Sequence, residues 1–212
     1  MKAIWVFGDS FTDRYILSNN KSYINWKGYT PKTYHEILGE KLDLSVKNFS
    51  ESYGMDNYTI FQTLCDNINE INQNIVVINW SEPVRFRLVD YVTQKWRTVL
   101  PLKSTRVVRG LPYVNGVKDE TVLDTFTNRE NHLWLTEIDS WIKIINKALS
   151  DSIVIHWTWH NNIQFQTITE ETNGEVIDFH YSEKGHIDLA NWIMDQIKIG
   201  TNKNPFNQNS IL

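Results

Sequence analysis

The sequence has only one cysteine, Cys65, among its 212 residues. A single thiol excludes an internal disulfide and a metal cluster built from cysteines. Because Cys65 lies within a stretch of helical spacing, we expect a buried thiol rather than a reactive one. The chain must therefore rely on a hydrophobic core, and its length is sufficient to form one.

Long apolar runs are also missing, and the first residues lack the basic segment, apolar stretch and cleavage site of a secretion signal. We expect no membrane partner and a cytoplasmic location, or a particle-associated one if the source is a virus.

Positive charge is not in excess, since 21 Lys and Arg stand against 25 Asp and Glu. The net charge of -4 disfavours nucleic acid as the main partner, and it leaves the oligomeric state open.

Four strand-like apolar runs alternate with stretches of helical spacing. The runs cover residues 2–8, 44–50, 74–80 and 152–160, and the helical stretches cover 30–42, 55–71, 131–149 and 182–199. This alternation predicts an α/β fold, a three-layer α/β/α sandwich with a central parallel sheet. The run 74–80 has no polar alternation until its end, which predicts a central strand.

The last two helical stretches each carry an apolar stripe that we expect to pack on the sheet. The stripes consist of Leu133, Ile138, Trp141, Ile142 and Ile145, and of Ile187, Ala190, Ile193, Met194 and Ile197.

The predicted domain covers residues 1–200, with an insertion at about 83–131 and a loose tail at 201–212. In the insertion, short β-like pieces, prolines and glycines stand where a helix is expected. It is locally basic and includes Arg85. This pattern is typical of a solvated face on a hairpin. If the insertion instead lies near a ligand site, Arg85 could contact an acidic substrate.

The first strand-like run ends in "GDSFT", which places Ser10 directly after a strand. In open parallel sheets ligands bind at this end of the strands, although a serine there can also simply cap a turn or a helix. "GDSFT" after an apolar strand resembles the first block of the SGNH (GDSL-like) hydrolases. The resemblance implies a flavodoxin-like α/β/α fold, with Ser10 as the nucleophile.

Two further segments are similar to the middle blocks of that family. "NFSESYGMDNYTI" implies that Gly54 supplies a backbone N–H to the oxyanion hole. The third block, Gly-Xaa-Asn-Asp in the family, reads "NWSE" here and places Ser81 at the asparagine position. We expect Ser81 to be the side-chain donor, because a hydroxyl can also donate. Asn79 would take this role if the strand were displaced by one residue.

The segment "VIDFHYSEKGHIDLANWI" resembles the family's last block, which implies that His180 is the base and Asp178 the acid that orients it. Asp178 precedes His180 by two residues rather than three, but residues two apart in an extended chain face the same side. His186 is the competing histidine. With Ser182 as N-cap, His186 would lie in the first helical turn, where the helix dipole disfavours an imidazolium.

Another histidine pair, His156 and His160, has a spacing that suits a metal only on a helix, so we expect structural or substrate-lining roles and no metal. Trp157 and Trp159 form an aromatic strand face that we expect in the core, although Trp159 could line a sugar site.

Together these residues predict a serine esterase that acts on acyl esters, acetylated glycans first, without metal or cofactor. Asp9, Asn79, Arg85 and Trp159 are the candidate substrate contacts. Two alternatives stay open: an SGNH-fold binding or structural module that has lost the chemistry, and an acyltransferase that uses the same serine.

Overall fold

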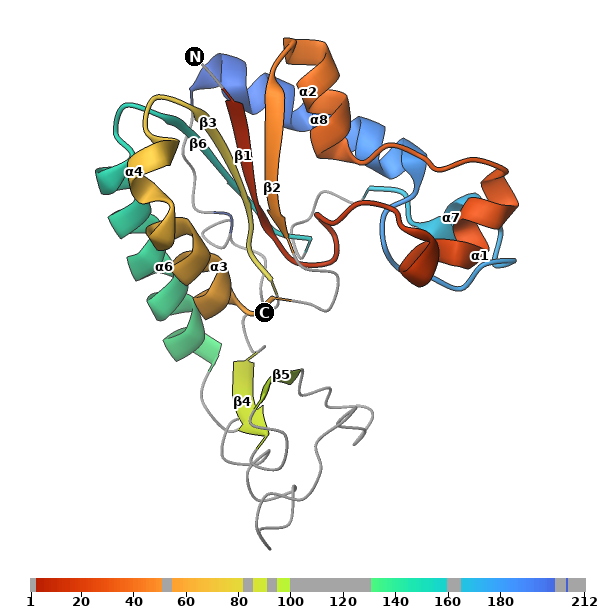
Figure 1. The fold of residues 1–212 in the computed structure, drawn as a ribbon, viewed down its shortest axis with the longest axis horizontal. Coiled ribbons are helices and arrows are strands. Elements are labelled where there is room, and N and C mark those ends of the chain that lie inside the picture. Colours follow the sequence, from red (N-terminus) through yellow and green to blue (C-terminus); the bar gives the residue numbers. More distant parts are fainter. Residues whose placement is uncertain are drawn as a thin grey trace, which may run out of the picture.

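The computed structural model describes residues 3–50, 55–81, 86–90, 95–99, 131–159, 165–200 and 205. Its centre is a sheet of four parallel strands, β1 (Ala3–Gly8), β2 (Ser45–Ser50), β3 (Ile75–Asn79) and β6 (Ile153–Trp157), in the order β2-β1-β3-β6 (Figure 1). Helices cover both faces of this sheet, which confirms the predicted three-layer α/β/α fold.

Each face of the sheet has its own helices (Figure 1). One face carries α2 (Tyr34–Leu42) and α8 (Glu183–Ile199), and the other carries α3 (Asn57–Asp66), α4 (Ile68–Ile71) and α6 (Asn131–Ala148). Along β1, Ile4 and Val6 pack toward α2 and α8, whereas Trp5 and Phe7 pack toward the other layer. This alternation follows from the pleat of a strand that is buried on both sides.

Two helices lie outside these layers and were not indicated by the apolar pattern. They are α1 (Leu17–Lys27) and α7 (Ile168–Glu171), which lie side by side (Figure 1). The Tyr23 hydroxyl of α1 donates to Glu171 of α7, and Lys27 Nζ lies 3.1 Å from the same carboxylate. Polar contacts therefore supplement the small apolar cluster beneath α1.

Three expectations about single side chains are wrong. Leu133 and Ile187 stand at the edges of their helical stripes and are 44% and 41% exposed, while Ile138, Ile142, Ile145, Ala190 and Ile193 are buried. Cys65 is partly exposed rather than buried. Its surroundings still raise the pKa of the thiol, chiefly through desolvation.

The predicted insertion contains a hairpin in which β4 (Phe86–Asp90) pairs antiparallel with β5 (Lys95–Val99). Arg85, His160 and Gly54 lie outside the described residues, as does the predicted tail apart from Pro205. Among the helices of the described part, none is long and apolar enough to cross a bilayer.

Strand order determines where a site can form. β1 pairs with β2 on one side and with β3 on the other, so the chain moves in opposite directions from β1. In open parallel sheets such a reversal of direction makes the carboxyl ends of the two strands, here β1 and β3, the expected place for a ligand. Asp9 and Ser10 follow β1, and Ser81 follows β3.

Candidate active site

Ser10 lies in a tight turn directly after β1. The Thr12 N–H donates to the Asp9 carbonyl at 2.9 Å and closes the turn. A Cβ atom on Gly8 would lie 2.5 Å from Thr12 Oγ1 and 2.7 Å from Asn79 Cβ, so only glycine allows this approach of β1 to β3. The turn leaves the Ser10 side chain partly exposed at the carboxyl edge of the sheet.

The three predicted catalytic side chains form one hydrogen-bonded series. His180 Nε2 lies 2.9 Å from Ser10 Oγ, and His180 Nδ1 lies 2.6 Å from Asp178 Oδ1. The contacts assign the ring proton to Nδ1, which leaves Nε2 free to accept from the serine hydroxyl. The fold thus joins residues 170 positions apart in the arrangement used for activating a serine.

The short spacing between Asp178 and His180 is compatible with this geometry. Asp178 Oδ1 accepts from the His180 backbone N–H at 2.9 Å as well as from the ring. Burial raises the pKa of Asp178, but the two hydrogen bonds from His180 outweigh it and leave the pKa below its ordinary value. Asp178 is therefore a carboxylate at neutral pH, the form that can orient an imidazole.

The loop that carries Asp178 and His180 is held by main-chain contacts to the segment before it. The Ile168 N–H donates to the His180 carbonyl, and the Ser182 N–H donates to the Gln166 carbonyl, both at 2.9 Å. Ser182 then caps α8 by accepting from the Gly185 N–H at 3.2 Å, as predicted. The histidine thus lies between a short antiparallel contact and the start of a helix.

The residues of the altered third block meet around the Asp9 carboxylate. Asn79 Nδ2 donates to Asp9 Oδ1 and Ser81 Oγ donates to Asp9 Oδ2, each at 2.8 Å, while the Phe11 N–H donates to Oδ1 at 3.1 Å. The side chains of Asp9, Asn79 and Ser81 are all fully buried. A buried carboxylate requires such donors, so these groups join the turn after β1 to the end of β3.

This network differs from the roles expected for its members. The Ser81 hydroxyl is bonded to Asp9 instead of pointing at a developing oxyanion, and the buried Asp9 and Asn79 leave no surface for a substrate. Ser81 is also held through its backbone, because its N–H donates to Asn57 Oδ1 at 2.7 Å and its carbonyl accepts from Asn57 Nδ2 at 3.1 Å. Asn57 lies within the quoted segment "NFSESYGMDNYTI", but sequence reasoning predicted no role for it.

The backbone N–H of Ser10 is the remaining candidate donor. Within the ranges that the structure describes, it donates to no other group. It lies on the residue whose hydroxyl would attack, where a tetrahedral intermediate would place its oxyanion. The second backbone donor implied by the resemblance, Gly54, lies outside those ranges.

Aromatic rings line the other side of His180. The Phe11 ring lies 4.7 Å from the His180 ring and stacks on Trp159 at 5.0 Å. Trp159 is partly exposed, whereas Trp157 is buried in the core. Of the three predicted substrate contacts that the structure describes, Trp159 is therefore the one with an accessible side chain near His180.

His156 is structural. Its Nδ1 accepts from Trp80 Nε1 at 3.1 Å, its Nε2 lies 2.9 Å from Asn146 Oδ1, and burial lowers its pKa to about 3. Across the described part of the chain, no cluster of three or more His, Cys, Asp or Glu side chains is arranged to hold a metal ion.

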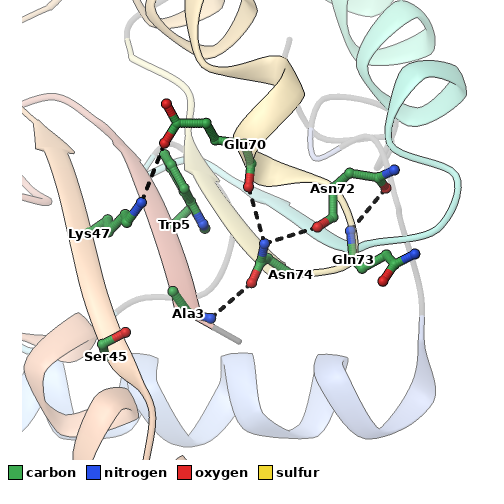
Figure 2. A pocket seen from close by; sticks show the side chains of 8 residues that line it. All are labelled: Ala3, Trp5, Ser45, Lys47, Glu70, Asn72, Gln73 and Asn74. Atoms are coloured by element: carbon green, nitrogen blue, oxygen red, sulfur yellow. Dashed lines mark hydrogen bonds and ion pairs between the residues drawn. The ribbon is translucent and has the colours of Figure 1, made fainter. Parts of the chain in front are cut away.

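A pocket of about 320 Å³ lies at the opposite, amino edge of the sheet, near the first residues of β1 and β2 (Figure 2). Its polar groups bond one another: Lys47 Nζ lies 3.5 Å from Glu70 Oε2, and the Asn74 amide donates to neighbouring carbonyls and accepts from the Ala3 N–H. This pocket holds no nucleophile with an adjacent base.

No family model, curated protein or solved structure matches this chain. Any functional assignment must therefore come from the chemistry of the site itself.

Proposed function

We propose that the protein is a serine esterase of the SGNH (GDSL-like) hydrolase type that cleaves acyl esters, with acetyl esters of carbohydrates as the first substrates to test. The observation that carries this proposal is the hydrogen-bonded series of Ser10, His180 and Asp178 at the carboxyl edge of the sheet. A serine hydroxyl is a weak nucleophile until a neighbouring base accepts its proton, and this series supports that transfer.

In the proposed acylation, Ser10 Oγ bonds to the ester carbonyl carbon while its proton passes to His180 Nε2. Asp178 stabilises the imidazolium, and the Ser10 N–H donates to the oxyanion. The bond to the leaving alcohol then breaks, and His180 gives the proton to the alcohol oxygen. In deacylation, water gives a proton to His180 and attacks the acyl-serine; the acid departs as Ser10 regains its proton.

The decisive experiment is labelling with a fluorophosphonate probe followed by peptide mapping. We expect an adduct on Ser10 in folded protein and none after heat denaturation or in Ser10→Ala. Ser10→Ala should also abolish hydrolysis of an aryl acetate while leaving the melting temperature nearly unchanged, because the side chain is partly exposed. Near-normal turnover in this variant would remove Ser10 from the mechanism.

A binding module is the second candidate, and the bond from the Ser81 hydroxyl to Asp9 favours it. Loss of one oxyanion donor costs a hydrolase about 10²–10³ in turnover. Folded protein that leaves Ser10 unlabelled would support the binding module. An acyltransferase would label equally well, and it would be distinguished by products in which the acetyl group moves to a sugar hydroxyl rather than to water.

A further inference from the structure

Asp178 is held at its main chain by one side chain. Thr169 Oγ1 accepts from the Asp178 N–H and donates to the Asp178 carbonyl, both at 2.8 Å, and the Thr169 N–H donates to the same carbonyl at 3.0 Å. Thr169 belongs to α7, a helix that the apolar pattern of the sequence did not reveal.

This contact matters because of the short spacing before His180. Asp178 accepts from both the backbone and the ring of His180 through one oxygen, so a small rotation of the Asp178 main chain would displace the ring contact. The neighbouring side chains give no apolar support, since Ile177 and Phe179 are 71% and 72% exposed. Hydrogen bonds from α7 therefore provide the local restraint on this segment.

Thr169 is itself fixed in place. The α7 helix begins with a capping box, in which Thr167 and Glu170 satisfy each other's backbone N–H groups. Its Ile168 is fully buried, and its Glu171 accepts from the Tyr23 hydroxyl and pairs with Lys27 of α1. A short helix anchored in this way can position a loop with little freedom.

We propose that Thr169 is a positioning residue for the proposed reaction: its hydroxyl holds the Asp178 main chain so that one carboxylate oxygen meets both the backbone and the ring of His180. This inference rests on the proposed esterase function for its kinetic effect, while its structural effect is independent of that function. A misplacement of about 1 Å in a catalytic group can cost roughly 10²-fold in rate.

The chain contains a matched control in the same turn. Thr172 Oγ1 accepts from the Val176 N–H at 3.1 Å and can donate to the Val176 carbonyl at 3.2 Å, with the Thr169 carbonyl a more distant acceptor at 3.5 Å. Thr172→Val thus removes the same two kinds of hydrogen bond from the same segment. The residue that loses them is Val176, which does not contact the His180 ring, whereas Asp178 does.

The test compares Thr169→Val, Thr169→Ser and Thr172→Val. One readout is the second-order rate constant for fluorophosphonate modification of Ser10, and the other is the NMR resonance of the His180 Nδ1 proton, assigned by its absence in His180→Ala. We expect Thr169→Val to slow modification about tenfold to a hundredfold and to lose the resonance through exchange with water. Thr169→Ser should retain both, and Thr172→Val should lower only the melting temperature.

The proposal fails if folded Thr169→Val keeps the parent rate and resonance, or if Thr172→Val reduces them equally. Should Thr169→Val not fold, Thr169→Ala removes the same hydroxyl with less steric demand and is measured in its place at lower temperature. If the parent protein itself is not labelled, the esterase proposal is wrong, and the NMR resonance alone then decides whether Thr169 holds Asp178.

Discussion

The loop at 178–180 and the first turn of α8 each contain a histidine, yet the two histidines have different surroundings. The side chain of His180 is 35% exposed and contacts both Asp178 and Ser10. His186 is 3% exposed and packs among the rings of Tyr15, Tyr34 and Tyr181. Six residues of separation thus divide a histidine that contacts Ser10 from one that is buried and held neutral.

The pKa of His186 shows the physical basis of this difference. Burial lowers it to about 3, with smaller contributions from His35 and His180. The ring also lies in the first turn of α8, where the helix dipole disfavours positive charge. In the proposed reaction the general base must become cationic, so a histidine in the loop suits that role better than one in the helix.

The strongest test of this comparison is His180→Ala. The variant removes the acceptor of the Ser10 proton, so we expect turnover of an aryl acetate to fall by roughly 10⁴–10⁶-fold. The partly exposed side chain contributes little to packing, so the melting temperature should change little. Retention of turnover within tenfold, in protein shown to be folded by circular dichroism, would contradict the assignment of the base.

Asp178→Asn should have the next largest effect. An amide that donates toward Nδ1 stabilises the wrong tautomer of His180 and cannot balance the imidazolium, so we expect a loss of about 10³–10⁴ in turnover. The same measurement on Asp188→Asn provides a surface control, because that carboxylate pairs only with Lys184 on α8 among the described residues. Equal losses in the two variants would mean that Asp178 has no special role.

His186→Ala should affect turnover by less than about tenfold, because the ring does not contact Ser10. It should instead destabilise the fold by on the order of 2 kcal/mol through the cavity that it leaves among the tyrosine rings. Chemical denaturation and aryl acetate turnover separate these two effects. A larger loss of turnover than that of His180→Ala would reverse the roles of the two histidines.

The last prediction concerns the dependence of stability on pH. Burial lowers the pKa of His35 to about 4 and that of His156 and His186 to about 3, from the ordinary value of 6.5. The unfolded chain therefore binds more protons below pH 6.5, and the free energy of unfolding falls as pH decreases from 6.5 toward these values.

Between pH 6.5 and 4.5 each of these buried histidines contributes a loss of up to about 2.5 kcal/mol, since one pKa unit corresponds to about 1.4 kcal/mol. Urea denaturation at the two pH values measures the total. His156→Gln should reduce the difference by removing one contribution. A free energy of unfolding that is unchanged between these pH values would show that the histidines are not held neutral.

The local patterns of the sequence identified most of the sandwich. Apolar runs located the four parallel strands, and the stripes on α6 and α8 located two covering helices, because burial on a strand or helix face follows a period that can be read directly. The patterns missed α1 and α7. Lys27 of α1 and Glu171 of α7 pair across 144 residues, so a polar contact, which leaves no apolar period, helps to hold these helices.

The candidate site, like the fold, was predicted from the sequence only in part. "GDSFT" and the segment around His180 indicated which residues to bring together, and the fold places them within hydrogen-bond distance. The partner of the Ser81 hydroxyl could not be predicted, because it depends on how closely β3 approaches the turn after β1. That approach is made possible by Gly8, and it places Asp9 between Asn79 and Ser81.

By itself, then, the sequence determined the strands and the main covering helices, since these depend on short-range periodicity. The candidate nucleophile, base and acid came from the resemblance of two short segments to the SGNH blocks. Only the tertiary structure decided which polar groups satisfy one another: Ser81 bonds Asp9, Asn57 holds Ser81, and Thr169 holds Asp178. A hydroxyl or amide can bond many partners. Which one it meets is decided by the register and packing of segments far apart in the chain.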